Sequence, residues 1–328
     1  MIRRSVGAGP LLPEIGLGTW NWGREVRLRE ARGCLHAYLD AGGFLLDTAP
    51  SYNGGTAEEF IGSLVRGGLR DRVVIATKAG VDPRTKELNL SRTAMLDALD
   101  GSLRRLGTDH VDVWQVHAWS DDADLAEILG ALDTAVTSGR ARHVGLCNHP
   151  GPLIRQAAAL QQEVSGAGAP LVSVQAEYSL LRREIEQDVL PSVAAAGAGL
   201  LAWSPLAGGA LTGKYDGAVS TGTRASDPYY EGFAERYLEP PEDRRVVEAV
   251  GIVARAMDVP PGAVALAWLR DRPGVVSALV GARDVDQLTA SLTACAVHLP
   301  DEVTHLLDAV SAPAPEAADA SQKESLIM

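Results

Sequence analysis

Three ionisable side chains each end a short apolar run, and a tyrosine follows the first of them closely. Asp47, Lys78 and His117 close these runs, and Tyr52 lies five residues after Asp47 in a turn that contains glycines. A phenol supported by an ammonium, a carboxylate and an imidazole is suited to moving a proton onto a carbonyl oxygen. Reduction of that carbonyl also needs a hydride, which no side chain supplies, so this chemistry requires a cofactor.

The types of the four residues predict a separate role for each. Free tyrosine titrates near ~10 and a neighbouring ammonium favours tyrosinate, so Lys78 is expected to lower the pKa of Tyr52. Asp47 is expected to keep Lys78 charged and oriented, while His117 hydrogen-bonds the substrate oxygen. Each residue alone is more often a cap, a salt bridge or a packing group, so the prediction depends on all four meeting at one place.

Short apolar strands alternate with amphipathic helices along most of the chain. The predicted strands are residues 14–18, 44–47, 73–77, 111–116, 143–146, 171–175, 200–203 and 275–280. The predicted helices are residues 28–41, 57–66, 92–106, 123–138, 152–162, 185–196, 242–257 and 284–295.

Eight such units predict an α/β protein with a parallel sheet closed into a (β/α)8 TIM barrel. In a barrel, the ends of consecutive strands converge on one face, which would bring Asp47, Lys78 and His117 together. A doubly wound open sheet is the alternative, although the first strand lacks the GxGxxG turn that marks dinucleotide-binding sheets.

Segments outside the repeat complete the predicted architecture. Residues 207–241 form a long loop after strand seven, and loops of this length are usually functional. Extra helices are predicted at residues 260–270 and from residue 300 to about residue 310. We therefore predict one barrel domain over residues 1–310 and a disordered C-terminal tail over residues 311–328.

The composition is that of an ordinary globular protein and disfavours several classes of function. The chain has 328 residues, and 42 acidic against 30 basic residues give a net charge of -12. Such a charge disfavours binding to nucleic acid or anionic membranes. Three cysteines without a CxxC pair argue against disulfides and metal sites, and for a cytoplasmic protein. Residues 189–213 carry no charge but contain prolines and glycines, so we do not expect a membrane span there.

Motifs in family order over nearly the whole chain resemble those of the aldo-keto reductases, in the branch of bacterial reductases and potassium-channel beta subunits. The matching strings are GLGTW at 16–20, DTAPSY at 47–52, ATK at 76–78, QVH at 115–117, GLCN at 145–148, QAEYS at 175–179, AWSPL at 202–206, GKY at 213–215 and GAR at 281–283. The resemblance implies a (β/α)8 barrel, NAD(P)H extended across its C-terminal face, and the catalytic tetrad Asp47, Tyr52, Lys78 and His117.

The same resemblance implies a set of cofactor-binding residues. Asn148 and Gln175 are expected to hold the carboxamide, and Trp203 to stack on the nicotinamide. Arg283 is expected to pair with a 2′-phosphate, which favours NADPH over NADH. The full expected set is Thr19, Trp20, Asn148, Gln175, Trp203, Ser204, Leu206, Gly208, Lys214, Arg224, Gly281, Arg283 and Gln287.

The chain departs from the family pattern at three places. Cys147 stands where a serine is usual, which removes a good hydrogen-bond donor to the carboxamide. Ala290 and Ser291 replace the usual Glu-Asn pair on the last helix, so weaker adenine contacts are expected. Residues 6–13 are expected to be irregular where the family has a short hairpin.

Three functions remain open from the sequence. The first is NADPH-dependent reduction of an aldehyde or ketone to an alcohol, with a small carbonyl substrate in a pocket formed by Trp22, Trp119 and the loop over residues 207–241, with Tyr229, Tyr230 and Phe233. The second is an NADP(H)-binding regulatory or redox-sensing subunit with little turnover, although the channel subunits that the chain resembles lack a histidine at the position of His117. The third is a non-redox barrel enzyme such as a lyase or isomerase. The substrate, the reaction direction and the oligomeric state are not determined by the sequence.

Overall fold

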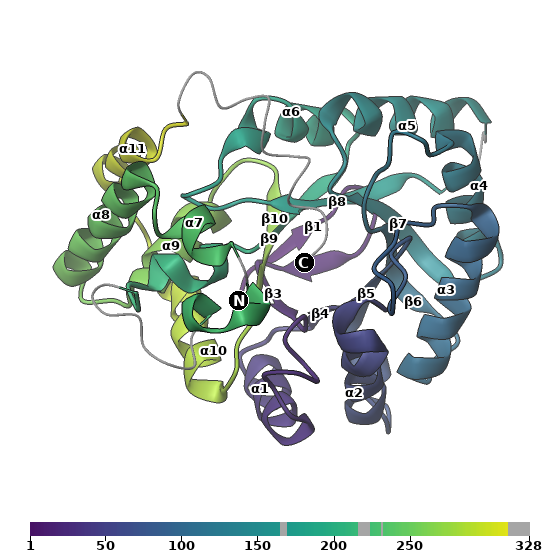
Figure 1. Ribbon diagram of the computed structural model, residues 1–328, viewed down its shortest axis with the longest axis horizontal. Coiled ribbons are helices and arrows are strands. Elements are labelled where there is room, and N and C mark those ends of the chain that lie inside the picture. The colour runs from purple at the N-terminus through teal and green to yellow at the C-terminus, as the bar shows by residue number, and fades with distance from the viewer. Residues whose placement is uncertain (165–168, 216–223, 231, 314–328) are drawn as a thin grey trace.

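Eight parallel strands form a closed barrel in the computed structural model, which describes residues 1–164, 169–215, 224–230 and 232–313 (Figure 1). The barrel order is β10-β3-β4-β5-β6-β7-β8-β9. The strands are β3 (Ile15–Gly18), β4 (Leu45–Asp47), β5 (Val74–Ala79), β6 (Val111–Val116), β7 (Ala141–Cys147), β8 (Leu171–Glu177), β9 (Gly199–Trp203) and β10 (Val275–Val280). The predicted (β/α)8 barrel is confirmed, and the open sheet is wrong because β10 pairs with β3 and closes the ring.

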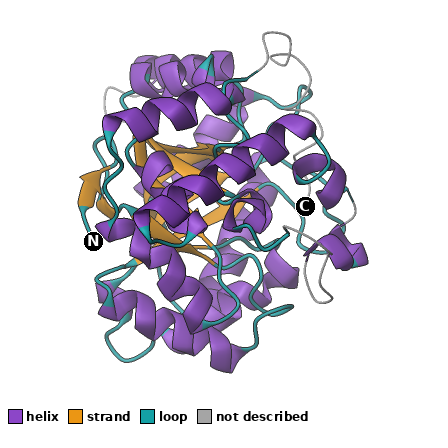
Figure 2. Cartoon of the chain, turned by 90° about the vertical axis from the view of Figure 1, so that its left-hand side faces the viewer, coloured by secondary structure: helices purple, strands orange, loops and turns teal. Residues whose placement is uncertain are grey.

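Helices surround the strands, as Figure 2 shows for one side of the molecule. The helices are α1 (Leu28–Asp40), α2 (Thr56–Leu64), α3 (Arg92–Leu106), α4 (Leu125–Thr137), α5 (Gly151–Val164), α6 (Val189–Ala195), α8 (Pro241–Met257), α9 (Pro261–Arg270), α10 (Val285–Leu292) and α11 (Asp301–Val310). The helix predicted at 185–196 is instead a 3-10 turn, η3 (Glu184–Glu186), followed by α6. A helix cannot run through Pro191 from further upstream, because proline lacks an N–H and its ring excludes the carbonyl four residues before it.

The long segment after β9 contains short helices rather than one open loop. They are η4 (Ala207–Thr212), η5 (Arg224–Ser226), η6 (Pro228–Tyr230) and α7 (Phe233–Tyr237). Residues 216–223 and 231 of this segment, and residues 314–328 of the predicted disordered tail, lie outside the described residues.

The N-terminal residues form the hairpin that the sequence did not predict. β1 (Arg3–Ser5) pairs with β2 (Leu11–Pro13) in antiparallel register, so the expected irregularity at 6–13 is wrong. Gly7, at φ +56°, permits the tight connection, and a Cβ there would lie 2.6 Å from the carbonyl oxygen of Gly197. The hairpin therefore packs against the loop that enters β9.

The interior of the barrel is apolar at the hairpin end. Leu45, Ala76 and Val113 belong to a buried cluster that includes side chains of the hairpin and of β8, β9 and β10. Asp47 and Lys78 follow Leu45 and Ala76 by two positions, and side chains two apart on a strand share a face. The same alternation that buries the apolar residues therefore points Asp47 and Lys78 inward at the opposite end.

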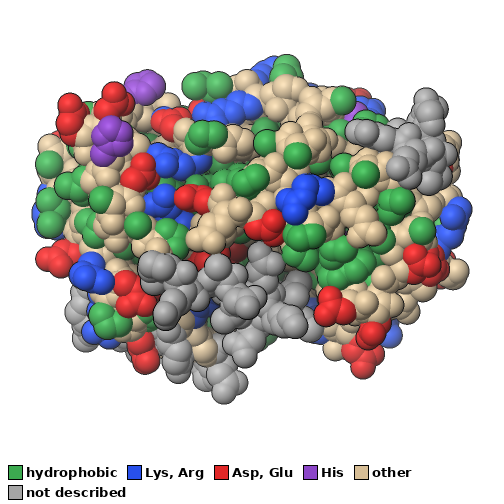
Figure 3. Space-filling view, turned by 90° about the horizontal axis from the view of Figure 1, so that it is seen from above, with side chains coloured by type: hydrophobic (Ala, Val, Ile, Leu, Met, Phe, Trp, Pro, Cys, Tyr) green, Lys and Arg blue, Asp and Glu red, His purple; other side chains and the backbone are tan. Residues whose placement is uncertain are grey.

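The outer surface is mixed in charge where Figure 3 shows it, with basic, acidic and apolar side chains interspersed on that face. Among the described residues, no single helix is long and apolar enough to cross a membrane. α8 and α9 reach the required length and hydropathy only as a pair, which is bent by 101°.

Candidate active site

Lys78 joins the predicted catalytic residues in one buried cluster. Its Nζ donates to Asp47 Oδ1 at 3.0 Å and Oδ2 at 2.9 Å, to the Tyr52 hydroxyl at 3.0 Å and to the carbonyl oxygen of Thr48 at 3.0 Å. Lys78 has no exposed surface, and Asp47 is 3% exposed. The His117 ring lies edge-on to the Tyr52 ring, with centroids 6.1 Å apart. The structure therefore brings together all four residues that the sequence singled out.

A strained turn directs Tyr52 at Lys78. Tyr52 opens η1 (Tyr52–Gly55), in which Asn53 has φ +50° and both glycines also have positive φ. Asn53 Nδ2 donates to the carbonyl oxygens of Trp20 and Trp22, each at 2.8 Å. These bonds hold a non-glycine residue in the left-handed region, which costs backbone energy that the rest of the loop must offset.

The electrostatics of Tyr52 differ from the sequence-based expectation. Burial raises the pKa of Tyr52 to about 12, while the positive charge of Lys78 acts in the lowering direction and does not outweigh it. Burial disfavours the charged form of Lys78, but the negative charge of Asp47, with Tyr52, raises the pKa of Lys78 above its ordinary value. The expected net lowering of the Tyr52 pKa is therefore wrong for this structure: a protonated phenol faces a charged ammonium.

His117 is neutral in this site. Burial, and then the positive charges of Lys78 and Lys86, lower the pKa of His117 well below its ordinary value. Its Nδ1 lies 3.5 Å from Ser51 Oγ, and Lys86 Nζ donates to the carbonyl oxygen of Ser51 at 2.5 Å. A neutral imidazole can position a substrate oxygen through a hydrogen bond without competing with Tyr52 to supply the proton.

A cavity of about 550 Å³ opens beside the cluster and continues along the ends of β8, β9 and β10 to α10. Asp47, Tyr52 and His117 line it, while Lys78 lies behind them. Every residue predicted to bind the cofactor also lines it: Thr19, Trp20, Asn148, Gln175, Trp203, Ser204, Leu206, Gly208, Lys214, Arg224, Gly281, Arg283 and Gln287.

Amide side chains connect the cavity wall to the catalytic cluster. Gln175 Nε2 donates to Asp47 Oδ1 at 2.8 Å, and Trp203 Nε1 donates to Asn148 Oδ1 at 2.9 Å. Cys147 Sγ is 3.7 Å from Gln175 Oε1, and burial raises the pKa of the Cys147 thiol to about 12. The residue that replaces the usual serine is therefore a neutral thiol and a weak donor to Gln175.

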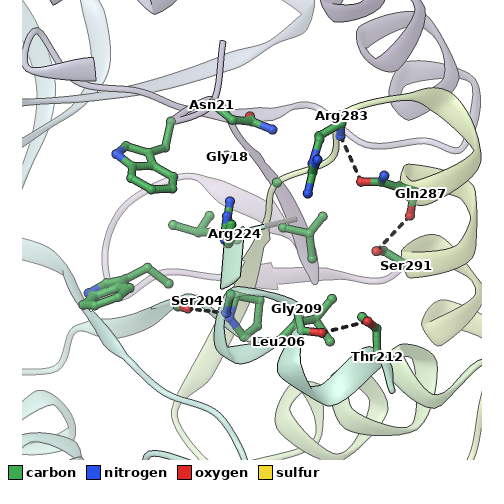
Figure 4. A pocket seen from close by; sticks show the side chains of 18 of the residues that line it. Gly18, Asn21, Ser204, Leu206, Gly209, Thr212, Arg224, Arg283, Gln287 and Ser291 are labelled. Carbon is green, nitrogen blue, oxygen red and sulfur yellow. Dashed lines mark hydrogen bonds between the residues drawn. The ribbon is translucent and has the colours of Figure 1, made fainter. Parts of the chain in front are cut away.

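The far end of the cavity combines a tight backbone turn with three cationic side chains. Gly208 and Gly209 have φ +62° and +100°, and a Cβ on Gly209 would lie 2.5 Å from Lys214 Nζ. In Figure 4, Arg224 and Arg283 point into the space between this turn and α10. Partial burial, and then the charges of Arg224 and Arg283, lower the pKa of Lys214 to about 8. Cations that repel one another beside a glycine turn fit the phosphate groups of a dinucleotide.

The first turn of α10 completes this end. Asp284 caps the helix by accepting from the backbone N–H of Gln287 at 2.8 Å. Gln287 Oε1 accepts from the backbone N–H of Arg283 at 3.2 Å, and Ser291 Oγ donates to the carbonyl oxygen of Gln287 at 3.1 Å (Figure 4). Ala290 and Ser291 line the cavity with a methyl group and a hydroxyl already bonded to the helix.

Three of the aromatic residues predicted for the substrate pocket do not line this cavity. Trp22 has no exposed surface and belongs to the main hydrophobic core. Trp119 packs against His149, with ring centroids 5.7 Å apart. Tyr229 is 52% exposed and lies under the guanidinium of Arg24, 3.3 Å from its ring centroid. Trp22 therefore packs in the core, Trp119 packs against His149, and Tyr229 lies at the surface.

Two other aromatic residues that the sequence also pointed to in the 207–241 loop, Tyr230 and Phe233, do line the cavity, whereas Tyr237 and Asn21 were not expected there. Tyr230, Phe233 and Tyr237, from the segment after β9, line the cavity. Asn21 also lines it and donates to the carbonyl oxygen of Ala282, a residue 261 positions away. An aromatic-rich loop after a barrel strand indicates a pocket wall, but no local pattern could have predicted the contact between Asn21 and Ala282.

Comparisons with known proteins show what the chain is similar to. The sequence profile of the Aldo/keto reductase family matches residues 14–312. A probable voltage-gated potassium channel subunit beta from Oryza sativa subsp. japonica is 32% identical over 313 residues, covering 92% of this chain and 94% of that protein. An uncharacterized oxidoreductase, YrpG, from Bacillus subtilis (strain 168) is 33% identical over 304 residues, covering 89% of this chain and 90% of that protein.

Proposed function

The chain belongs to the aldo/keto reductase family, and we propose that it reduces an aldehyde or ketone to an alcohol with NADPH. The observation that carries the proposal is the Lys78 ammonium, which bonds the Tyr52 hydroxyl at 3.0 Å and the Asp47 carboxylate at 2.9 Å at the edge of a cavity. In this cluster Tyr52 can donate a proton, and the positive charge of Lys78 can stabilise the tyrosinate that remains. NADPH supplies the hydride when it is bound.

In the proposed mechanism, Tyr52 donates its hydroxyl proton to the carbonyl oxygen as negative charge develops there. Lys78 stabilises the resulting tyrosinate across the 3.0 Å hydrogen bond, and Asp47 holds Lys78 in place. Neutral His117 orients the substrate oxygen towards Tyr52. The aromatic side chains of Trp20 and Tyr230 favour an apolar, aromatic or sugar-like carbonyl compound in the adjoining space.

The charges of the cavity favour NADPH over NADH. Lys214, Arg224 and Arg283 line the end opposite the catalytic cluster, where the phosphates of an extended dinucleotide would lie. Trp203, Asn148 and Gln175 would hold the nicotinamide end. The 2′-phosphate of NADPH adds up to two negative charges to a site with three cationic side chains, whereas NADH offers a neutral hydroxyl there.

Replacement of Tyr52 by Phe tests the proposal. The variant keeps the ring but removes the proton, so NADPH oxidation across a panel of aldehydes and ketones should fall by about 10²–10⁴-fold. NADPH binding, measured by the quenching of tryptophan fluorescence, should be unchanged. Tyr229→Phe is the matched control, because it removes an exposed hydroxyl outside the cavity and should retain full activity. Full activity of Tyr52→Phe would contradict the role of Tyr52.

A regulatory or redox-sensing subunit is the second candidate, favoured by relatives named as probable potassium channel beta subunits. Such a protein would bind NADPH tightly and turn over no carbonyl compound in the panel. His117, next to Tyr52 in the cavity, supports the catalytic function instead. Turnover of any panel substrate above about 1 s⁻¹, an ordinary enzymatic rate, favours the reductase.

A further inference from the structure

Glu25 places a negative charge inside the cationic end of the cavity. It lies in the loop between β3 and α1, and its side chain is 12% exposed. Its Oε2 forms an ion pair with Arg283 Nε at 3.0 Å, and its Oε1 accepts a hydrogen bond from the Tyr230 hydroxyl. Arg283 and Tyr230 both line the cavity. The carboxylate therefore binds one of the groups that a phosphate would need.

The charge of Glu25 acts on all three cations of this end. It pairs directly with Arg283, and it raises the pKa of Lys214 and of Arg224 against the lowering effect of burial on each. A negative charge beside three positive charges makes the electrostatic potential at this end less positive, so an incoming anion is attracted less strongly. Removing it would strengthen the repulsion between the cations and make the site more attractive to phosphate.

We propose that Glu25 is an internal counter-ion of the phosphate-binding end, which weakens the binding of NADP(H) and reduces its preference over NAD(H). This inference rests on the proposed function, because it assumes that a dinucleotide occupies the cavity. A phosphate that binds Arg283 meets a carboxylate already paired with the same guanidinium. Either the ion pair between Glu25 and Arg283 opens, or the carboxylate and the phosphate lie close together and repel each other. The cost falls most heavily on the ligand with the most phosphate charge. The same repulsion speeds dissociation of the cofactor after each turnover.

Replacement of Glu25 by Gln isolates the charge. Glutamine keeps the length of the side chain and can still accept hydrogen bonds from Tyr230 and Arg283, so the loop contacts remain possible. Dissociation constants would be measured by tryptophan fluorescence for NADPH, for NADH and for 2′,5′-ADP, which carries the 2′-phosphate without the nicotinamide. We expect affinity for NADPH and 2′,5′-ADP to rise about tenfold, and affinity for NADH to change by less than about threefold.

Matched variants separate this effect from a change in net charge or in folding. Glu30→Gln removes one negative charge from the exposed first turn of α1 and should leave all three affinities unchanged. Glu25→Asp keeps the charge and should stay close to the unmodified protein. In an Arg283→Met background, most of the gain from Glu25→Gln should disappear, because the carboxylate has lost its direct partner.

The outcomes distinguish failure of this inference from failure of the proposed function. Weaker NADPH binding by Glu25→Gln, or equal changes for NADPH and NADH, would show that Glu25 supports the site structurally and would overturn the counter-ion role. If the unmodified protein bound neither dinucleotide, the proposed function itself would fall. A tenfold gain restricted to ligands with a 2′-phosphate establishes Glu25 as a counter-ion that weakens the binding of these ligands.

Discussion

The energetics of single residues in this site depend on a balance between the cost of burying a charge and the contacts that stabilise it. Lys78 has no exposed surface, and Asp47, Tyr52 and the carbonyl oxygen of Thr48 supply its polar contacts. A buried ion pair is costly to break on one side, because the remaining charge stays in a medium that solvates it poorly. The same arrangement that prepares Tyr52 for proton transfer therefore also makes the site sensitive to single substitutions.

Replacement of Lys78 by Met should affect both activity and stability. Within the described residues, the amide of Gln175 would be the one side-chain partner left to the buried Asp47, so the free energy of unfolding should fall by about 3–5 kcal/mol. Carbonyl reduction should fall by at least about 10²-fold, because nothing replaces the charge that stabilises tyrosinate. Urea unfolding and steady-state kinetics measure the two effects. Activity within tenfold of the unmodified enzyme would rule out the role of Lys78 in proton transfer.

The raised pKa of Tyr52 predicts opposite pH dependences for the two directions of the reaction. Because burial raises this pKa to about 12, Tyr52 is protonated at neutral pH, and reduction should be nearly constant from about pH 6 to about pH 9. Alcohol oxidation needs tyrosinate, whose fraction rises about tenfold per pH unit below the pKa, so its rate should increase steadily over the same range. Initial rates in both directions test this. A reduction rate that declines through neutral pH would mean a much lower pKa for Tyr52.

At the scale of elements, α2 holds the Tyr52 turn against the strand that carries Lys78. Glu58 on α2 is fully buried, and its Oε1 accepts from Thr77 Oγ1 at 2.6 Å while its Oε2 accepts from Arg105 Nε at 2.7 Å. α2 also approaches α3 so closely that a Cβ on Gly62 would lie 2.4 Å from the carbonyl oxygen of Arg105. Only glycine allows this approach.

Two glycine substitutions in helices should have opposite effects on stability. Gly62→Ala should lower the free energy of unfolding by about 1–3 kcal/mol, because the clash with the end of α3 exceeds the gain in helix propensity. Gly251→Ala in α8 is the matched case: its Cβ would meet only the end of the Arg255 side chain, at 3.5 Å. That variant should gain about 0.5–1 kcal/mol. Urea unfolding compares them, and equal effects would mean that α2 can move away from α3.

At the scale of the whole molecule, buried neutral histidines make stability depend on pH. His149 is 2% exposed, and its Nδ1–H donates to the carbonyl oxygen of Cys147 at 2.7 Å. Burial lowers the pKa of His149 to about 4, against the opposing effect of that hydrogen bond. Burial also lowers the pKa of His117. Both histidines bind protons more readily in the unfolded chain than in the folded protein.

The free energy of unfolding should therefore fall as the pH is lowered. Above about pH 6.5, His149 is neutral in both states, and between about pH 6.5 and pH 4 only the unfolded chain binds the proton. Complete loss of this contribution amounts to ~3 kcal/mol. Urea unfolding across this window should show a shallower decline for His149→Gln than for the unmodified protein. Replacement of the exposed His305 by Gln should keep the original pH dependence, and an unchanged slope in His149→Gln would contradict the prediction.

The sequence by itself determined the strand–helix order and, given a closed barrel, the meeting of Asp47, Tyr52, Lys78 and His117, while the pairing of β10 with β3 in the structure excluded the open sheet. These features follow from local patterns, because alternation along a strand fixes which side chains point inward and the ends of parallel strands meet on one face. The family motifs placed the expected cofactor residues at strand ends, in the segment after β9 and at the start of α10, and the structure lines one cavity with all of them.

Only the tertiary structure decided whether burial or the charge of Lys78 dominates the pKa of Tyr52, and which aromatic side chains line the cavity. The pKa of Tyr52 depends on how deeply barrel closure buries it, and the positions of Trp22 and Tyr229 depend on how the loops pack. The pairing of Glu25 with Arg283 joins the loop after the first barrel strand to the one after the last. Burial depth and contacts between distant segments arise only when the barrel closes, and no pattern of neighbouring residues encodes them.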